Sequence, residues 1–269
     1  GAASSAPQTN EGEDAVALGR FLSFLNPEQT ATTPNESKSV PGRAGQAIRL
    51  TGDHPINTTL GNFSRHEPFS VSLWLQTPDV KERAVVMHRS RAWTDAGSRG
   101  YELLIEEGRL KWSLIHFWPG DAISIRASEP LPVNAWVHVI VTNDGAGRAG
   151  GLRIFVDGRS ARTEVIRDHL TKDIAGGGGD FIALGERFRD KGFKGGLVDE
   201  LRVFERELTT LEAREVFSSG TIDGLRAKSS SELTADEREA MFEYYLANHD
   251  EPFRQHLCEV LLELVIQYN

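Results

Sequence analysis

The chain has 269 residues and a net charge of −9, and its 39% hydrophobic content is enough to bury a full core. Proteins that bind nucleic acid need a basic face to neutralise phosphates, so binding to nucleic acid is not expected of this acidic chain. The single cysteine, Cys258, excludes an internal disulfide framework. No run of about 18–20 apolar residues predicts a membrane-spanning helix.

The first residues give little information about the fold. Residues 1–14 are polar and small, and the chain does not open with Met, so we interpret them as disordered or as added at the boundary of an excised fragment. The segment 15–25 is apolar enough to begin the fold, either as an edge strand or as a short helix. From Gln46 onward, short apolar runs recur between Gly, Asp, Asn and Pro, which is typical of an all-β sandwich.

Alternation with a period of two predicts the individual strands. In the segment 69–76 it directs Val71, Leu73 and Leu75 to one face and Trp74 to the other. Further strands are predicted at 101–105, 109–118 and 122–126, which form a meander, and at 136–142, 152–156, 181–184 and 196–204. About a dozen strands make two packed sheets rather than one.

Helices are predicted only near the C-terminus. The capping-box pairs Thr209 with Glu212 and Thr234 with Glu237 precede helices at 211–217 and 235–247, and Pro252 suits the first turn of a last helix. We interpret 219–232 as a linker and 233–269 as a helical pair that begins a following domain or forms an arm leading to it.

The last helix is apolar around more of its circumference than a surface helix usually is. Something is therefore expected to cover it. Either it packs on the preceding helix and the sandwich, or it docks a further domain or a second copy of the chain.

Four segments, 47–53, 136–139, 154–158 and 195–204, occur in the order found in one family of jelly-roll domains, and the last precedes the capped helix with Glu212. They cover roughly residues 45–218 and resemble LamG-like domains of the concanavalin A-like lectin/glucanase superfamily. The segments 90–101, 117–123 and 187–195 resemble more closely the LamG insert of large planctomycete-type cytochrome c proteins.

This resemblance implies a two-sheet antiparallel jelly-roll sandwich over residues 15–218, followed by a small C-terminal helical hairpin. It also implies an extracytoplasmic location, periplasmic or secreted, and neighbouring domains of a larger chain as partners. No Cys-x-x-Cys-His motif for haem attachment occurs. The resemblance supplies neither a ligand nor catalytic residues.

Aromatic residues provide one candidate ligand site. Aromatic faces pack well on the apolar faces of sugar rings, and the meander with its preceding loop contains four candidates: Trp93, Tyr101, His116 and Trp118. The alternative is that they anchor loops or fill the core. Two groups of basic residues, 187–194 and 83–99, offer contacts for an acidic glycan, although such runs more often form salt-bridged surfaces.

Asp53 and Asp199 are candidate calcium ligands at one rim of the sandwich, because hard cations favour oxygen atoms on loop-borne carboxylates. The alternative for Asp199 is hydrogen bonding to turn amides near Gly195 or pairing with an arginine. Calcium is the only cofactor we consider.

No strand carries the alternating carboxylates with which glycanases of this superfold work, so no catalytic residue is predicted. Glu106 and Glu107 are predicted to lie in a turn. We therefore expect a non-catalytic interaction or spacer module of a large exported protein. A carbohydrate-binding, lectin-like module is the alternative, and a glycan-active enzyme is third.

Overall fold

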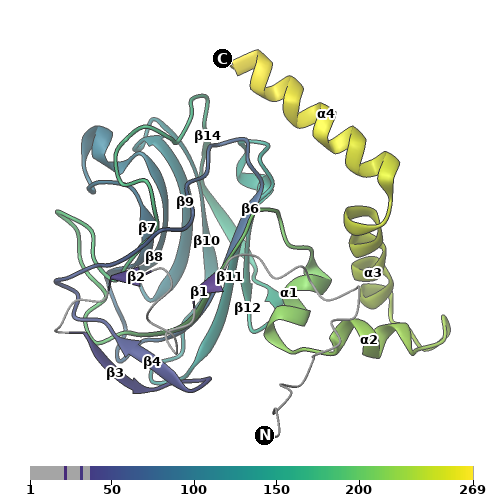
Figure 1. Cartoon of the computed structure of the whole chain (residues 1–269), viewed down its shortest axis with the longest axis horizontal. Coiled ribbons are helices and arrows are strands. Elements are labelled where there is room, and N and C mark those ends of the chain that lie inside the picture. Colours follow the sequence, from purple (N-terminus) through teal and green to yellow (C-terminus); the bar gives the residue numbers. More distant parts are fainter. Residues whose placement is uncertain (1–20, 23–30, 33–36, 269) are drawn as a thin grey trace, which may run out of the picture.

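The computed structural model describes residues 21–22, 31–32 and 37–268 of the chain, in which two antiparallel sheets pack face to face and four helices follow (Figure 1). The first sheet has the order β13-β12-β11-β6-β16-β4-β3, and β1 pairs with β16. Its strands are β1 (Phe21–Leu22), β3 (Lys38–Pro41), β4 (Gln46–Arg49), β6 (Phe69–Gln76), β11 (Val137–Asn143), β12 (Leu152–Val156), β13 (Arg159–Ser160) and β16 (Leu197–Phe204).

The second sheet has the order β14-β10-β9-β8-β7-β15-β5-β2. Its strands are β2 (Ala31–Thr32), β5 (Ile56–Thr58), β7 (Arg83–Arg89), β8 (Gly100–Glu106), β9 (Arg109–Phe117), β10 (Asp121–Pro130), β14 (Thr163–His169) and β15 (Ala183–Leu184). The predicted jelly-roll sandwich is confirmed. Predictions for residues 1–14 and for most of 15–25 lie outside the described residues, although Phe21–Leu22 pair as a strand.

The core between the sheets is built from the alternation that the sequence predicts. Val71, Leu73 and Leu75 of β6 are fully buried. An aromatic cluster links the two sheets, because the Phe69 ring lies 4.9 Å from the Tyr101 ring and 5.9 Å from the Trp112 ring, centroid to centroid. The indole nitrogen of Trp112 donates to the carbonyl of Thr142 at 2.9 Å, so the buried polar atom is satisfied.

The outer face of the first sheet is covered by helices, which form a second apolar cluster with it (Figure 1). These helices are α1 (Thr210–Phe217), α2 (Thr221–Arg226) and α3 (Ala235–Asn248), and α4 (Glu251–Tyr268) follows them. Both predicted capping boxes are present. The segment predicted as a linker contains α2, whose Ile222 and Leu225 are buried in this cluster. Only two apolar residues mark so short a helix, which is too few for a visible period.

Helix α4 leaves most of its apolar surface exposed. Phe253, Leu257, Val260, Leu262 and Ile266 are each at least 38% exposed. Its contact with the sandwich comes near its end, where Leu264 lines a hollow together with Gly147 and Arg148. The cover expected from the sequence is therefore only partly supplied by the described residues. None of the described helices is both long and apolar enough to cross a membrane.

Candidate functional site

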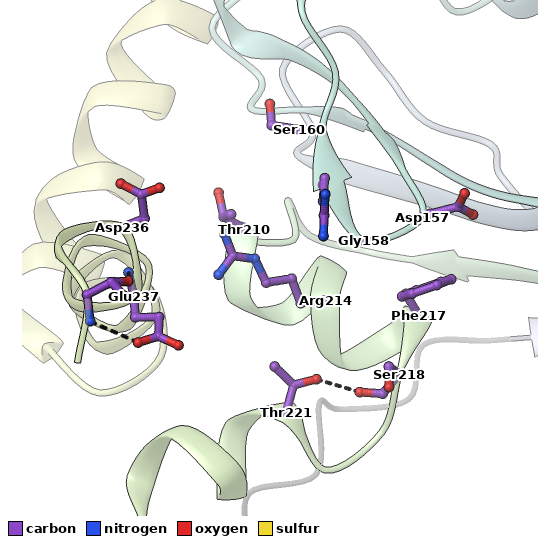
Figure 2. Close-up of a pocket in the computed structure, with 12 residues that line it drawn as sticks. Asp157, Gly158, Ser160, Thr210, Arg214, Phe217, Ser218, Thr221, Asp236 and Glu237 are labelled. Atoms are coloured by element: carbon purple, nitrogen blue, oxygen red, sulfur yellow. Dashed lines mark hydrogen bonds between the residues drawn. The ribbon is translucent and has the colours of Figure 1, made fainter. Parts of the chain in front are cut away.

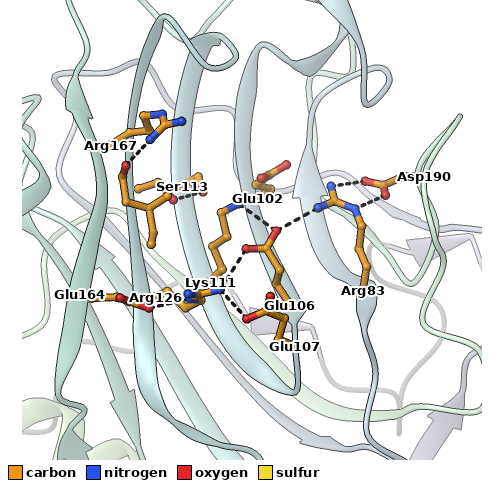
Figure 3. Close-up of polar contacts among 12 residues, drawn as sticks. Arg83, Glu102, Glu106, Glu107, Lys111, Ser113, Arg126, Glu164, Arg167 and Asp190 are labelled. Carbon is orange, nitrogen blue, oxygen red and sulfur yellow. Dashed lines mark hydrogen bonds and ion pairs between the residues drawn. The ribbon is translucent and has the colours of Figure 1, made fainter.

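The site lies on the outer face of the second sheet, the face of β7–β10 and β14 that is turned away from the sandwich core. Alternation along β9 directs Trp112 and Leu114 into the core and Lys111 and Ser113 onto this outer face. Figure 3 shows the polar side chains of neighbouring strands meeting across it. Although the face is turned outward, Lys111 and Ser113 are almost completely buried.

Glu106 is the centre of an ion-pair network on this face. It is the last residue of β8 rather than part of a turn, which corrects the expectation from the sequence. Its carboxylate lies 3.3 Å from Arg83, 3.1 Å from Lys111 and 3.7 Å from Arg126 (Figure 3). One carboxylate is therefore shared among three cations.

Asp190 joins the network from the loop before β16. Arg83 donates to both of its carboxylate oxygens, at 2.6 and 3.0 Å. Burial alone would raise the pKa of Asp190, but hydrogen bonds from Arg83 and Arg187 outweigh it, so the pKa lies below its usual range. Asp190 therefore stays ionised and fixes the loop to β7.

Glu102 and Arg187 form a fully buried ion pair. Their side chains are both 0% exposed, and the carboxylate of Glu102 lies 2.6 Å from Nη1 of Arg187. Arg187 also lies 2.6 Å from Asp190, so one guanidinium serves two carboxylates. Neither the role of Glu102 nor this pair is visible in the sequence, because a glutamate inside an apolar strand gives no sign of a partner 85 residues further on.

Trp93 and Trp118 come together above this network. Their ring centroids are 6.2 Å apart, and both rings are half-buried. Arg83 lies 4.2 Å from the centroid of Trp93, and Lys111 lies 4.5 Å from that of Trp118. Cation–π contacts of this kind stabilise the position of each indole over the sheet.

Backbone bonds attach the loop of Trp93 to the loop before β16. The amide of Trp93 donates to the carbonyl of Phe188 at 3.1 Å. Phe188 is 61% exposed, and Phe117, which precedes Trp118, is 49% exposed. We call the ring pair Trp93 and Trp118, together with the exposed Phe188 bonded to Trp93 through the backbone and the exposed Phe117 next to Trp118 in the chain, the aromatic patch. Trp93 and Trp118 were predicted as ligand residues, whereas Phe117 and Phe188 were not.

Tyr101 does not belong to this site. It is fully buried in the core, where its hydroxyl donates to the carbonyl of Gly61 at 2.6 Å, so it cannot contact a glycan. The prediction fails because Tyr101 is one residue out of phase with Glu102, and alternation directs it inward. His116 is half-buried and hydrogen-bonded to the carbonyl of Asp173 at 2.6 Å, an interaction that anchors a loop.

Asp199 and Asp53, the two proposed calcium ligands, lie in different surroundings. Asp199 is fully buried and accepts hydrogen bonds from the amides of Arg43, Ala44 and Glu200 at 2.9–3.0 Å. It thus holds a turn, as its alternative predicts, but the turn between β3 and β4 rather than the one at Gly195. Asp53 is exposed, beyond the other end of β4. Within the described ranges, no three His, Cys, Asp or Glu side chains gather to hold a metal ion.

A separate hollow of about 710 Å³ lies between the β12–β13 hairpin and the helices. Figure 2 shows Arg214 reaching into it from α1, with Asp236 and Glu237 on the α3 side. Phe217 forms part of its lining and packs on Trp74, with the ring centroids 5.7 Å apart. Acidic, basic and hydroxyl groups are mixed in its lining, so the hollow does not indicate one class of ligand.

Two facing antiparallel sheets define the chain as a β-sandwich, with an aromatic patch on the outer face of the second sheet. A sequence profile described as the concanavalin A-like lectin/glucanases superfamily matches residues 50–214, more than half of the chain. The chain belongs to this superfamily, as its resemblance to LamG-like domains predicts. No curated protein matches its sequence significantly.

Solved structures share the fold at low identity. The binding domain of Paraclostridial Mosquitocidal Protein 1 is 16% identical with a TM-score of 0.55, and the binding domain of botulinum neurotoxin serotype G is 15% identical with a TM-score of 0.52. The alignments cover 70% of this chain and 46–47% of those chains. This chain therefore spans about half the length of these neighbours, and at such identities the likeness concerns the fold alone.

Proposed function

We propose that the chain is a non-catalytic saccharide-binding module of a larger exported protein, and that the aromatic patch is its binding surface. The observation that carries the proposal is the pair Trp93 and Trp118, 6.2 Å apart. Rings that are fixed before the ligand arrives lose little conformational freedom on binding, which favours affinity. The apolar faces of a sugar stack on such rings.

The ion-pair network beneath the aromatic patch, which we call the floor, supports binding rather than hydrolysis. Its members are Arg83, Glu102, Glu106, Lys111, Arg126, Arg187 and Asp190. Glu102 and Glu106 point to the same face of β8 but lie four residues apart, about 13 Å along a strand. The carboxyl groups of glycosidases are about 5–9.5 Å apart. Both carboxylates are also paired with cations, so neither is poised to protonate a leaving group or to activate water.

The setting of the module is part of the proposal. LamG-like domains are typical of proteins outside the cytoplasm, which supports an extracytoplasmic location for this chain. The structural neighbours are binding domains, and the alignments cover 46–47% of those chains. We propose a comparable role here, in which the sandwich both positions neighbouring domains and presents the aromatic patch.

A glycan array followed by affinity electrophoresis tests this proposal. Wild-type protein is expected to bind at least one glycan, and Trp118→Ala and Trp93→Ala to weaken binding at least tenfold, or about 1.4 kcal/mol. Phe242→Ala is the matched control, because Phe242 is an exposed aromatic residue on α3. Binding is expected to survive EDTA, and no reducing ends to be released. Absence of binding across the array, or binding that both tryptophan variants retain, would refute the proposal.

A further inference from the structure

We infer that the aromatic patch selects anionic saccharides, that is, sugars that carry a carboxylate or a sulfate group. The inference rests on the proposed function and adds the class of ligand. It starts from three exposed arginines beside the patch, Arg91, Arg167 and Arg189, which we call the arginine rim.

Two arginines of the rim contact rings of the patch, and the third lies in the loop of Trp93. The guanidinium of Arg167 lies 5.6 Å from the ring centroid of Trp118, and that of Arg189 lies 5.3 Å from the ring centroid of Phe188. Arg91 is two residues before Trp93 in the same loop. A ligand on the rings therefore meets guanidinium groups at their edge.

The cations of the floor are paired with carboxylates of the protein, whereas the arginines of the rim are free to meet an anionic ligand. In the floor, Arg83, Lys111, Arg126 and Arg187 each lie within 2.6–3.1 Å of at least one carboxylate oxygen. In the rim, none of the three arginines forms an ion pair with a carboxylate of the described residues. Arg167 donates instead to the carbonyl of Ile166 at 2.7 Å. The floor is therefore neutralised internally, whereas the rim keeps its positive charge.

Two exposed carboxylates on this face are already neutralised by an arginine of the floor. Glu107 and Glu164 are two exposed acids beside the floor, and both are already paired with Arg126, at 3.0 and 2.7 Å. The chain as a whole carries a charge of −9, which disfavours contact with polyanions elsewhere on its surface. A polyanion is therefore expected to approach at the rim.

Guanidinium groups suit the predicted ligand. Their planar fork donates two parallel hydrogen bonds to a carboxylate or a sulfate, and such charge-assisted bonds are stronger than neutral ones. The sugar ring then stacks on Trp118 while its acidic substituent reaches Arg167. Neutral sugars make the stacking contact alone.

Affinity electrophoresis of the whole chain in matched gels tests the inference. The probes are dextran and dextran sulfate for the sulfate group, and galactan and polygalacturonate for the carboxylate. We expect at least one anionic polymer to bind about tenfold more tightly than its neutral partner. The double variant Arg167→Ala/Arg189→Ala should remove that advantage and leave binding to the neutral polymer unchanged, whereas Arg238→Ala on α3, an exposed matched control, should change neither.

The outcomes separate the inference from the proposed function. Equal binding to neutral and anionic polymers, lost in Trp118→Ala, overturns the arginine rim and leaves the saccharide site in place. Binding to anionic polymers that persists in Trp118→Ala overturns both, because charge alone then accounts for it. If none of the four polymers binds, the arginine rim is overturned, and the glycan array alone decides on the saccharide site. In 1 M NaCl, where the Debye length is about 3 Å, the anionic advantage should shrink and the stacking contribution remain.

Discussion

Two buried histidines make the fold sensitive to acid. His138 lies on the outer face of the first sheet, 2% exposed, with its Nε2 2.9 Å from the hydroxyl of Ser72. His88 is 5% exposed and bonded to the carbonyl of Glu186 at 2.8 Å. Burial, with a nearby arginine in each case, lowers the pKa of both to about 3. Both are therefore neutral in the folded protein.

The size of the effect follows from these pKa values. In the unfolded chain a histidine takes up a proton below its ordinary pKa of about 6.5, whereas the folded protein does not until about pH 3. Stability is therefore lost as the pH falls below 6.5. At pH 5 the difference is about 1.5 units, which at 1.36 kcal/mol per unit is about 2 kcal/mol for each histidine.

Urea unfolding at pH 7.5 and pH 5 measures this loss. His138→Gln, whose side chain can still reach Ser72, is expected to reduce the loss of unfolding free energy between the two pH values by about 2 kcal/mol. His169→Gln serves as the control, because His169 is exposed at the edge strand β14. If His138→Gln showed the same loss as the wild type, His138 would not be held neutral by burial, and the reasoning would be wrong.

Three further predictions concern residues of the core and the candidate sites. Tyr101→Phe removes the hydrogen bond to Gly61 and should cost about 1 kcal/mol in thermal or urea unfolding without changing saccharide binding; altered binding would contradict its place in the core. Glu102→Leu leaves the buried Arg187 with Asp190 alone and should destabilise by about 3 kcal/mol, whereas Glu102→Leu/Arg187→Met should recover part of the loss; a purely additive double variant would exclude coupling. Calcium or EDTA should leave the melting temperature unchanged, because the oxygens of Asp199 are occupied by amides; a rise with calcium would restore the metal site.

The strands and capped helices could be predicted because their signals are local. Alternation in 69–76 and the capping boxes at Thr209 and Thr234 each depend on residues within a few positions of one another. The last helix was predicted from its apolar residues, but the sequence could not show that much of this surface stays exposed. What covers a helix depends on the placement of distant elements.

The candidate site was only half predictable for the same reason. Trp93 and Trp118 stood out as aromatic residues in or beside the meander and its preceding loop, but their proximity depends on how two chain segments fold back over one sheet. Tyr101 and Glu102 show how a shift of one residue decides between core and outer face. Partners such as Arg187 for Glu102 are 85 positions apart and follow only from the topology.

The most direct test of the account observes the five tryptophans at once. Their indole N–H signals in ¹H–¹⁵N NMR spectra can be followed while a bound saccharide is titrated into the whole chain. The signals of Trp93 and Trp118 are expected to shift, whereas those of Trp74, Trp112 and Trp136, which lie outside the aromatic patch, are expected to stay in place. Saturable binding that leaves Trp93 and Trp118 unmoved would contradict the account.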